Sequence, residues 1–371
     1  MKKISTKDLS IYIHIPFCKT ICVYCGFLTY ANKEKLIGAY IKALLNEISA
    51  KAGNLNKKKI VSIYFGGGTP SLIEPDKIDE ILTAIRKKFK IEKNAEITIE
   101  CNPESVTAEK LQNYKKIGIN RISMGIQSLK KKTLWRVARP HNEKDVNMAI
   151  STIKKTGFTN FGTDCIMGLP YQTLTSFKKD VLKILSYRPP HMSFYFLSYD
   201  TKKIDLIAKD CPSEEEQVKM YKWLVTKLKK NGYGHYEVSN YALPGFECRH
   251  NLRYWQQLEY LGLGLGAHSF IKDTCIVNEE NLEKYIENPL GTSEKIVLDP
   301  ELKRLDYIML NIRTTIGINL VKYEKKFGES EKLIKNAKPY LKSGMLAKKG
   351  MKLAATDKGF LFIDRITKDL F

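Results

Sequence analysis

The sequence predicts an α/β fold: an incomplete, TIM-like (β/α)6 barrel with a small α+β, winged-helix-like domain at its C-terminal end. Short apolar runs alternate with amphipathic stretches from about residue 11 to residue 197, which is typical of parallel βα units. The pattern then changes, and the 371 residues are enough for one large barrel and a further small domain.

The predicted strands are short runs rich in apolar residues. They cover Ile11–Ile15, Ile60–Phe65, Ile97–Glu100, Arg121–Met124, Phe161–Asp164 and His191–Phe196. Apolar residues at helical spacing lie between them, most clearly over Leu36–Ile48, Ile78–Phe89 and Leu174–Leu185. Six βα units are too few for a closed eight-stranded barrel, so we expect an open one.

Three regions are expected along the chain: a partial barrel over 1–200, a barrel-covering region over 201–300 and the small domain over 301–371. A helix is predicted near Glu214–Lys230 in the covering region. In the small domain, two short runs, Met345–Ala347 and Met351–Leu353, flank Gly350. This spacing is typical of a β-wing.

The chain is strongly basic, with 62 Lys and Arg against 40 Asp and Glu and a net charge of +22. The lysines are scattered and no Arg-rich stripe with interleaved aromatics occurs, which favours a solvated surface over a nucleic-acid face. A basic face for anionic lipid or an acidic partner stays open. No run approaches 18 apolar residues, and Met1–Asp8 lacks an apolar signal region. We therefore expect a cytoplasmic protein, with peripheral membrane contact as an option.

Three of the eight cysteines crowd into one segment, Cys18–Cys25, with the spacing C-x3-C-x2-C. The other five are dispersed, so the pattern indicates a reducing compartment and one metal site. A closed zinc site needs four ligands, but Gly26 and Phe27 follow Cys25. A [4Fe–4S] cluster held by three thiolates instead leaves one iron open for a small molecule. A three-thiolate zinc site is the alternative.

Polar residues fall where the predicted strands end. Gly66–Thr69 follows the second strand, Glu100 closes the third, Gln127 follows the fourth and Asp164 closes the fifth. Ligands of parallel α/β folds bind at this rim. A glycine-rich turn lets the backbone approach a polar ligand, although a tight strand-to-helix turn would also use it.

The segment from Tyr12 through Cys18 to Cys25, followed by Gly66–Pro70, resembles the signature of radical S-adenosylmethionine (SAM) proteins. The resemblance implies a radical-SAM barrel in which Cys18, Cys22 and Cys25 hold a [4Fe–4S] cluster whose open iron binds SAM. It also implies that one electron cleaves the sulfonium bond and yields a hydrogen-abstracting 5′-deoxyadenosyl radical. The cofactor carries this chemistry, while the protein binds and orients it.

The same resemblance implies a set of SAM contacts. Glu100, Gln127, Arg139 and Asp164 match SAM-contacting positions of the oxygen-independent coproporphyrinogen III oxidase family. Carboxylates and amides suit ribose hydroxyls, and a guanidinium suits the SAM carboxylate. Singly, each residue could instead cap a helix or form a salt bridge. The full expected set is Tyr12, Tyr24, Gly67, Gly68, Thr69, Glu100, Gln127, Arg139 and Asp164.

The block His250-Asn-Leu-Arg-Tyr254-Trp255 resembles the heme-binding motif of radical SAM heme chaperones, a sister group of the oxidase. A neutral imidazole beside aromatic rings suits axial ligation of heme iron. A histidine hydrogen-bonded inside an aromatic core is the alternative.

Two departures from the oxidase branch favour the chaperone. The oxidases commonly carry a further cysteine where Phe27 stands here, and they are longer before the first strand, which is expected here from about Ile11. The likeness spans about residues 10–365. Asn311 and Ala355 replace a more usual Gly and Leu, which changes packing more than chemistry.

The predicted function is a radical SAM heme chaperone that transfers heme to respiratory or heme-storage proteins, with an electron donor such as flavodoxin. No catalytic side chain is assigned, and no nucleic-acid partner is expected. One alternative is an enzyme, oxygen-independent coproporphyrinogen III dehydrogenase, whose tetracarboxylate substrate the basic charge would attract. Another, prompted only by the charge of +22, is a radical SAM enzyme acting on RNA.

Overall fold

The structure is a computed structural model that describes residues 8–198 and 203–371. Two expectations lie outside the described residues. They are the absence of a signal sequence, which concerns chiefly residues 1–7, and the region boundary between 200 and 201. Among the helices of the described ranges, none is long and apolar enough to cross a membrane.

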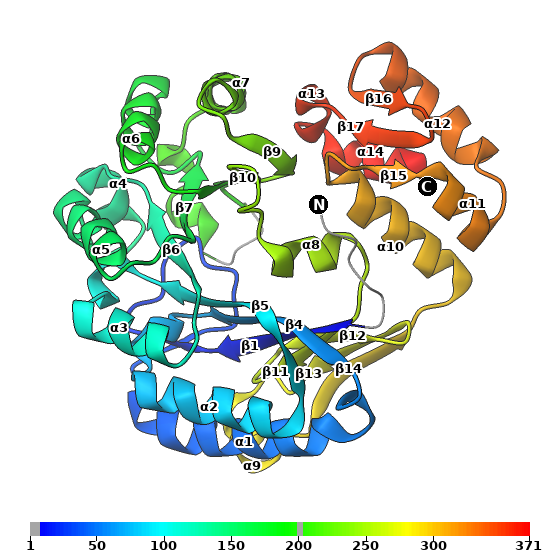
Figure 1. Ribbon diagram of the computed structural model, residues 1–371. Helices are drawn as coiled ribbons and strands as arrows, with labels where there is room; N and C mark the ends of the chain where they lie inside the picture. Colours follow the sequence, from blue (N-terminus) through cyan, green and yellow to red (C-terminus); the bar gives the residue numbers. More distant parts are fainter. Residues whose placement is uncertain (1–7, 199–202) are drawn as a thin grey trace.

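A curved parallel sheet forms the centre of the molecule, and each of the six predicted strands is confirmed (Figure 1). Each strand pairs in parallel with the next along the chain. In order, they are β1 (Asp8–Ile15), β4 (Lys59–Gly67), β5 (Lys90–Cys101), β6 (Arg121–Gln127), β7 (Phe161–Met167) and β8 (His191–Phe196).

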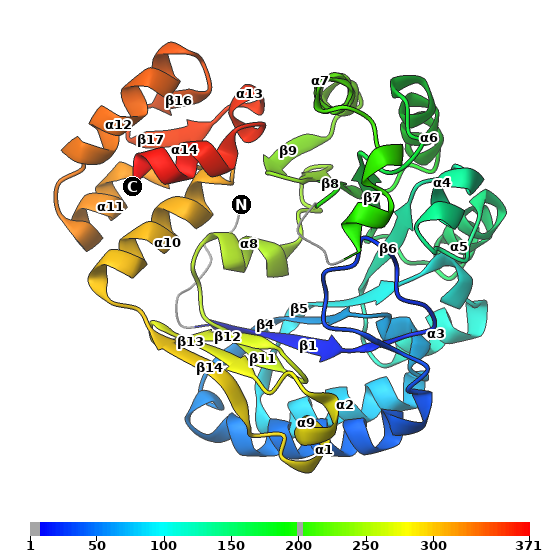
Figure 2. The same cartoon turned by 180° about the vertical axis from the view of Figure 1, so that it is seen from behind.

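Helices cover the outer face of this sheet, as Figures 1 and 2 show from opposite sides. The three predicted apolar stripes are confirmed as α1, α2 and α6. Side chains of Thr107, Asn142 and Thr173 cap the N-termini of α3, α5 and α6, each accepting backbone N–H bonds that the first turn leaves free. The helices are α1 (Ile37–Ala52), α2 (Pro75–Lys88), α3 (Ala108–Lys116), α4 (Lys131–Arg136), α5 (Glu143–Lys155) and α6 (Leu174–Ser186).

The sheet extends beyond the six predicted strands at both edges, to twelve strands in the order β14-β13-β12-β11-β1-β4-β5-β6-β7-β8-β10-β9. Only β11 adds in parallel, beside β1; the others pair antiparallel. These additions cover edges that would otherwise expose unpaired backbone groups. They are β9 (Gly234–Glu237), β10 (Asn240–Ala242), β11 (Tyr260–Leu263), β12 (His268–Ile271), β13 (Thr274–Asn278) and β14 (Thr292–Val297).

Three further helices belong to this part of the chain: α7 (Glu214–Lys230), α8 (Arg249–Trp255) and α9 (Leu282–Glu287). The predicted helix near 214–230 is confirmed as α7, which packs on α6, while α9 packs on α1. Helix α8 lies across the inner side of the sheet (Figure 1). The short elements are β2 (Phe17–Cys18), β3 (Tyr30–Ala31) and single 3-10 turns at Glu34–Leu36, Gly53–Leu55, Pro70–Leu72, Pro103–Ser105, Ile204–Leu206 and Ala208–Asp210.

The small C-terminal region combines helices with an antiparallel sheet, as predicted; beyond the two runs of the expected wing, the sheet has a third strand, β15. Strands β16 and β17 are the expected wing, and Gly350 between them has φ 57°, a left-handed conformation that suits glycine. Its elements are α10 (Pro300–Ile312), β15 (Ile318–Asn319), α11 (Leu320–Phe327), α12 (Glu331–Lys342), β16 (Leu346–Lys349), β17 (Lys352–Ala355), α13 (Asp357–Phe360) and α14 (Ile363–Leu370).

Strand register decides which side chains reach the inside of the barrel. Apolar residues of β1 such as Ile11 and Ile13 are fully buried in the hydrophobic core. Alternate residues point to the other face of the sheet, and there Tyr12 pairs with Tyr64 of β4. The barrel interior is therefore polar and aromatic, and its outer face is apolar.

Candidate functional site

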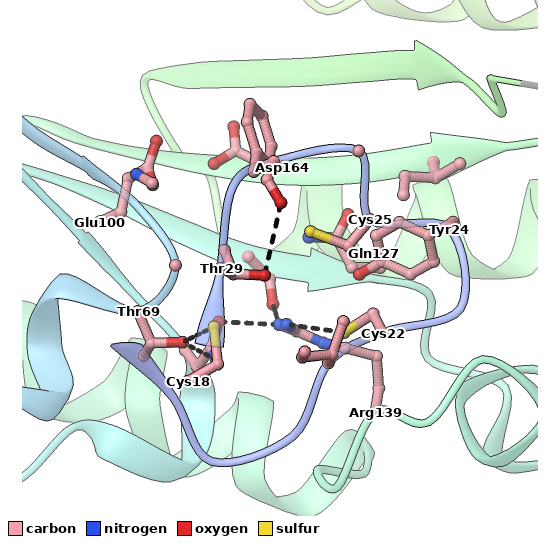
Figure 3. Close-up of a pocket in the computed structure, with 18 of the residues that line it drawn as sticks. Cys18, Cys22, Tyr24, Cys25, Thr29, Thr69, Glu100, Gln127, Arg139 and Asp164 are labelled. Carbon is pink, nitrogen blue, oxygen red and sulfur yellow. Dashed lines mark hydrogen bonds between the residues drawn. The ribbon is translucent and has the colours of Figure 1, made fainter. Parts of the chain in front are cut away.

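A cavity of about 640 Å³ opens at the carboxyl ends of the parallel strands. Eleven of the thirteen predicted site residues line it, and Tyr12 and His250 do not. Figure 3 shows how the cysteine loop and the strand ends face one another across it. The predicted lining residues are Cys18, Cys22, Tyr24, Cys25, Gly67, Gly68, Thr69, Glu100, Gln127, Arg139 and Asp164.

The three motif cysteines lie on one short loop. A turn closes it, with the Cys25 N–H donating to the Cys22 carbonyl at 3.1 Å, and Val23 N–H donates to the Val137 carbonyl. Burial raises the pKa of the Cys18 thiol to about 11 and also raises the pKa of Cys25. In the described residues, no group of three or more His, Cys, Asp or Glu side chains gathers closely enough to hold a single metal ion.

Two hydrogen-bond donors face the cysteine sulfurs. The Thr69 hydroxyl donates to Cys18 Sγ at 3.5 Å, and Arg139 Nη1 donates to Cys22 Sγ at 3.8 Å. Such donors favour the thiolate, which is the form that binds metal. Arg139 Nε is buried without a partner among the described atoms. Soft sulfur donors, a nearby cation and an unused N–H therefore suit an iron–sulfur cluster with an anionic ligand beside it.

The glycine turn leaves space that a side chain would fill. Gly67 has φ 113°, and a Cβ there would lie 2.6 Å from the His14 ring. At Gly68 a Cβ would lie 2.9 Å from Cys18 Sγ. Both contacts are too close for a larger residue, so glycine lets this backbone run directly beside the cysteine loop.

Two carboxyl groups are fixed on the cavity wall. Glu100 accepts from the Tyr64 hydroxyl at 2.9 Å and from the Gly67 N–H at 3.2 Å. Asp164 accepts from Ser123 and Ser193 hydroxyls at 2.7 and 2.6 Å. Burial raises the pKa of both, that of Glu100 to about 7, although these hydrogen bonds oppose the rise. Each carboxyl is therefore held in place through both of its oxygens, and both residues line the cavity.

Two strand boundaries differ from the sequence expectation. Asp164 lies within β7 rather than at its end, because pairing with β8 continues to Met167. Gln127 is the last residue of β6 and has φ 64°. That conformation is uncommon and strained for a residue with a side chain, and here it occurs at a residue lining the cavity.

Several lining residues are not among the site residues predicted from the sequence. They include Tyr64, Asn102, Tyr195 and Phe196. Phe27, Tyr195 and Phe196 are aromatic lining residues that remain 69, 40 and 42% exposed. The last two end the sixth strand, so their position at the rim was a usable signal; the contacts of Tyr64 and Asn102 required the packed structure.

Tyr12 and His250 lie behind the cavity wall. The Tyr12 ring stacks 6.2 Å from the Tyr64 ring, and its hydroxyl lies 3.2 Å from His14 Nδ1. His250 is 1% exposed; its Nδ1 lies 2.9 Å from the Ser62 hydroxyl and its Nε2 2.9 Å from the Tyr254 hydroxyl. Its contact with heme stays a prediction, as does that of Tyr12 with SAM.

Three cysteines on one loop, at the strand ends of a partial parallel barrel, are the arrangement expected of a radical SAM protein. The Radical SAM superfamily model matches residues 12–184. That superfamily implies a [4Fe–4S] cluster and SAM as cofactors.

Curated relatives extend the match to almost the whole chain. The chain is 34% identical over 365 residues to the heme chaperone HemW of Lactococcus lactis, with 95% of each covered. It is 31% identical to the protein of the same name from Bacillus subtilis, and the match covers 86% of this chain and 87% of that protein. The chain therefore belongs to the heme chaperone HemW family of radical SAM proteins.

A solved structure supports the fold. Coproporphyrinogen III oxidase (HemN) from Escherichia coli superposes with a TM-score of 0.86 and 24% identity, covering 98% of this chain and 90% of that one. At this identity the likeness concerns the fold alone.

Proposed function

We propose that this protein is a heme chaperone that holds a [4Fe–4S] cluster, SAM and heme and passes the heme to acceptor proteins. One observation carries the proposal beyond family membership: the three thiols line the same cavity as the exposed aromatic rings of Phe27 and Phe196. A metal-binding loop and a flat apolar surface thus share one cavity, which suits a cluster beside a porphyrin.

The cluster would be bound by Cys18, Cys22 and Cys25, with SAM over the neighbouring strand ends. When bound, the cluster supplies the electron that SAM cleavage needs. Arg139 offers a guanidinium for the SAM carboxylate, and the Gly67–Gly68 backbone allows close approach of its amino group. Glu100 and Asp164 offer acceptors for the ribose hydroxyls.

Heme would use the aromatic side of the cavity. A porphyrin face packs well on rings such as Phe27 and Phe196, and the net charge of +22 attracts its propionates. Phe27 stands where oxidases commonly carry a further cysteine, so the position that separates the two branches lies in this cavity lining.

His250 contact with heme is part of the proposal. Burial lowers the pKa of His250 to about 3, so the imidazole is in the neutral form that binds iron. Its Nε2 is held by the Tyr254 hydroxyl, and the Tyr64 ring lies 5.1 Å away. Because the ring lies behind the cavity wall at Tyr64, iron ligation requires Tyr254 to release this nitrogen and Tyr64 to move aside.

The partners follow from this role. Acceptors would be respiratory or heme-storage proteins, and an electron donor of the flavodoxin type would serve the cluster. We place these exchanges in the cytoplasm, with the basic surface available for an acidic partner or an anionic membrane.

One experiment separates the chaperone from a coproporphyrinogen dehydrogenase. Anaerobically reconstituted protein is given heme, and in a second reaction coproporphyrinogen III with SAM and reductant. We expect a stable Soret band in the first and no decarboxylated product in the second. Catalytic formation of protoporphyrinogen would overturn the proposal. Cys22→Ser should lose the iron–sulfur absorption, whereas Cys275→Ser, on β13 outside the cavity lining, should keep it.

A further inference from the structure

The side chain of Asn102 lies between the two groups that donate to the cysteine sulfurs. Its Nδ2 donates to Thr69 Oγ1 at 3.3 Å, and its Oδ1 accepts from Arg139 Nη2 at 2.9 Å. Thr69 in turn donates to Cys18, and Arg139 donates to Cys22. A continuous hydrogen-bonded chain thus runs from Cys18 to Cys22 through one amide, and part of it is drawn in Figure 3.

We infer that Asn102 is a positioning residue for the cluster, because it sets the direction of both sulfur hydrogen bonds. Thr69 Oγ1 accepts from Asn102, so its own hydrogen is free to point at Cys18. Arg139 Nη2 is occupied by Asn102 and by the Gly125 carbonyl at 2.6 Å, which leaves Nη1 for Cys22. A carboxamide carries its donor and its acceptor on two separate atoms of one short side chain, so it can meet Thr69 and Arg139 at the same time.

The fold fixes Asn102 from both of its sides. Its backbone N–H donates to the Ser105 hydroxyl at 3.2 Å and its carbonyl accepts the Ser105 N–H at 3.0 Å, which closes the 3-10 turn Pro103–Ser105. Opposite, a Cβ on Gly125 would approach Arg139 Nη2 and Asn102 Oδ1 to 3.2 and 3.3 Å. Glycine at 125 thus leaves room for this contact.

The same side chains separate two hollows. Cys22, Thr69, Asn102 and Arg139 line the main cavity and also a smaller hollow that Lys19 and Glu104 border. Loss of the Asn102 amide would therefore weaken the sulfur hydrogen bonds and open the cluster to solvent from this second hollow. Hydrogen bonds to cluster sulfurs stabilise the reduced state, which is the more negative one, and so raise the reduction potential of the cluster.

The test uses the full chain, reconstituted anaerobically, and depends on the proposed cluster but not on heme. Asn102→Ala removes both contacts, while Asn102→Asp keeps the acceptor for Arg139 and loses the donor to Thr69. Asn120→Ala is the matched control: this amide also bonds on both sides, to Ile97 N–H and the Ala95 carbonyl, but precedes β6 at the opposite end of the strands.

Both Asn102 variants should still bind iron. The reduction potential of their cluster should be lower than in the unaltered protein, and they should lose the cluster faster in air. Asn120→Ala should change thermal stability alone. The double variant Thr69→Val/Asn102→Ala should have a lower cluster potential than the unaltered protein, but the decrease should be smaller than the sum of the decreases in the two single variants. This is expected because both changes act on the same hydrogen bond to Cys18. An unchanged cluster potential in both Asn102 variants would overturn the inference. If Asn102→Asp does not fold, an unchanged potential in Asn102→Ala alone would overturn it. An unaltered protein without a cluster would instead refute the proposed function.

Discussion

The hydroxyl of Tyr64 donates a hydrogen bond of 2.9 Å to Oε1 of Glu100, joining neighbouring strands at the cavity wall. The ring of the same tyrosine lies 5.1 Å from the ring of His250. Tyr64 therefore stands between the carboxyl proposed to bind SAM and the histidine proposed to contact heme.

Tyr64→Phe should weaken SAM binding. The hydrogen bond from Tyr64 holds the pKa of Glu100 down against the effect of burial, so its loss leaves a less ionised and less fixed acceptor. We expect SAM affinity to fall about fivefold, or about 1 kcal/mol, by anaerobic calorimetry. Unchanged affinity would show that Glu100 does not contact SAM or does not need Tyr64.

SAM binding and folding should both depend on the ionisation of Glu100, whose pKa is raised to about 7. If SAM binds the carboxylate, its affinity at pH 6 is about tenfold weaker than at pH 8. Folding has the opposite dependence: because the folded protein binds the proton more tightly, this contribution to stability is full below pH 4.5 and is lost as pH rises through about 7.

Glu100→Gln should remove both pH dependences, measured by calorimetry and by thermal melts of the same preparation. Tenfold variation in affinity that persists in Glu100→Gln would assign the titration to another group, such as Asp164, the other cavity-lining carboxyl whose pKa burial raises.

Phe27→Ala should weaken heme binding. This ring is 69% exposed and lines the cavity, so it has surface left to pack on a porphyrin. We expect about a fivefold loss of heme affinity, or about 1 kcal/mol, from Soret titration. Trp135→Ala is the control, since that ring is 76% exposed but outside the lining. Equal effects in the two variants would place heme elsewhere.

His250→Ala should lose the Soret spectrum of histidine-ligated heme, whereas Tyr254→Phe, which frees Nε2, should retain it. His250→Ala should also cost about 2–4 kcal/mol of folding stability, because a buried ring and two hydrogen bonds are removed. A variant that loses only stability and keeps the spectrum would give His250 a structural role alone.

Acid titration checks the same histidine. Its folded pKa of about 3 lies below the ordinary value of 6.5, so its contribution to stability is present above pH 6.5 and is lost as pH falls through about 3. In His250→Asn, the free energy of unfolding should fall less steeply as the pH is lowered between these two values.

The strands and the rim could be predicted from the sequence because both depend on local pattern. Apolar runs indicated β1 and β4, and polar motifs directly after such runs placed Gly67 and Glu100 on one edge. The added strand β11 was not predicted, since four residues, Tyr260–Leu263, give little periodicity and their pairing with β1 is set by the whole fold.

The contacts between loops could not be predicted. Asn102 meets Thr69 and Arg139 only because the ends of β4 and β5 converge with the loop that follows α4, and spacing along the chain does not reveal that contact. For His250, the motif indicated the aromatic neighbours but not the buried bond to Ser62, 188 residues away.

Transfer of heme tests the central claim most directly. Heme-loaded, cluster-containing protein is mixed anaerobically with the apo form of a b-type respiratory heme protein, and the Soret change is followed beside a parallel reaction with a passive heme scavenger. We expect transfer to the respiratory protein to be at least tenfold faster than loss to the scavenger, without decarboxylated porphyrin products. Equal rates, or turnover of coproporphyrinogen III by the same preparation, would contradict a chaperone function.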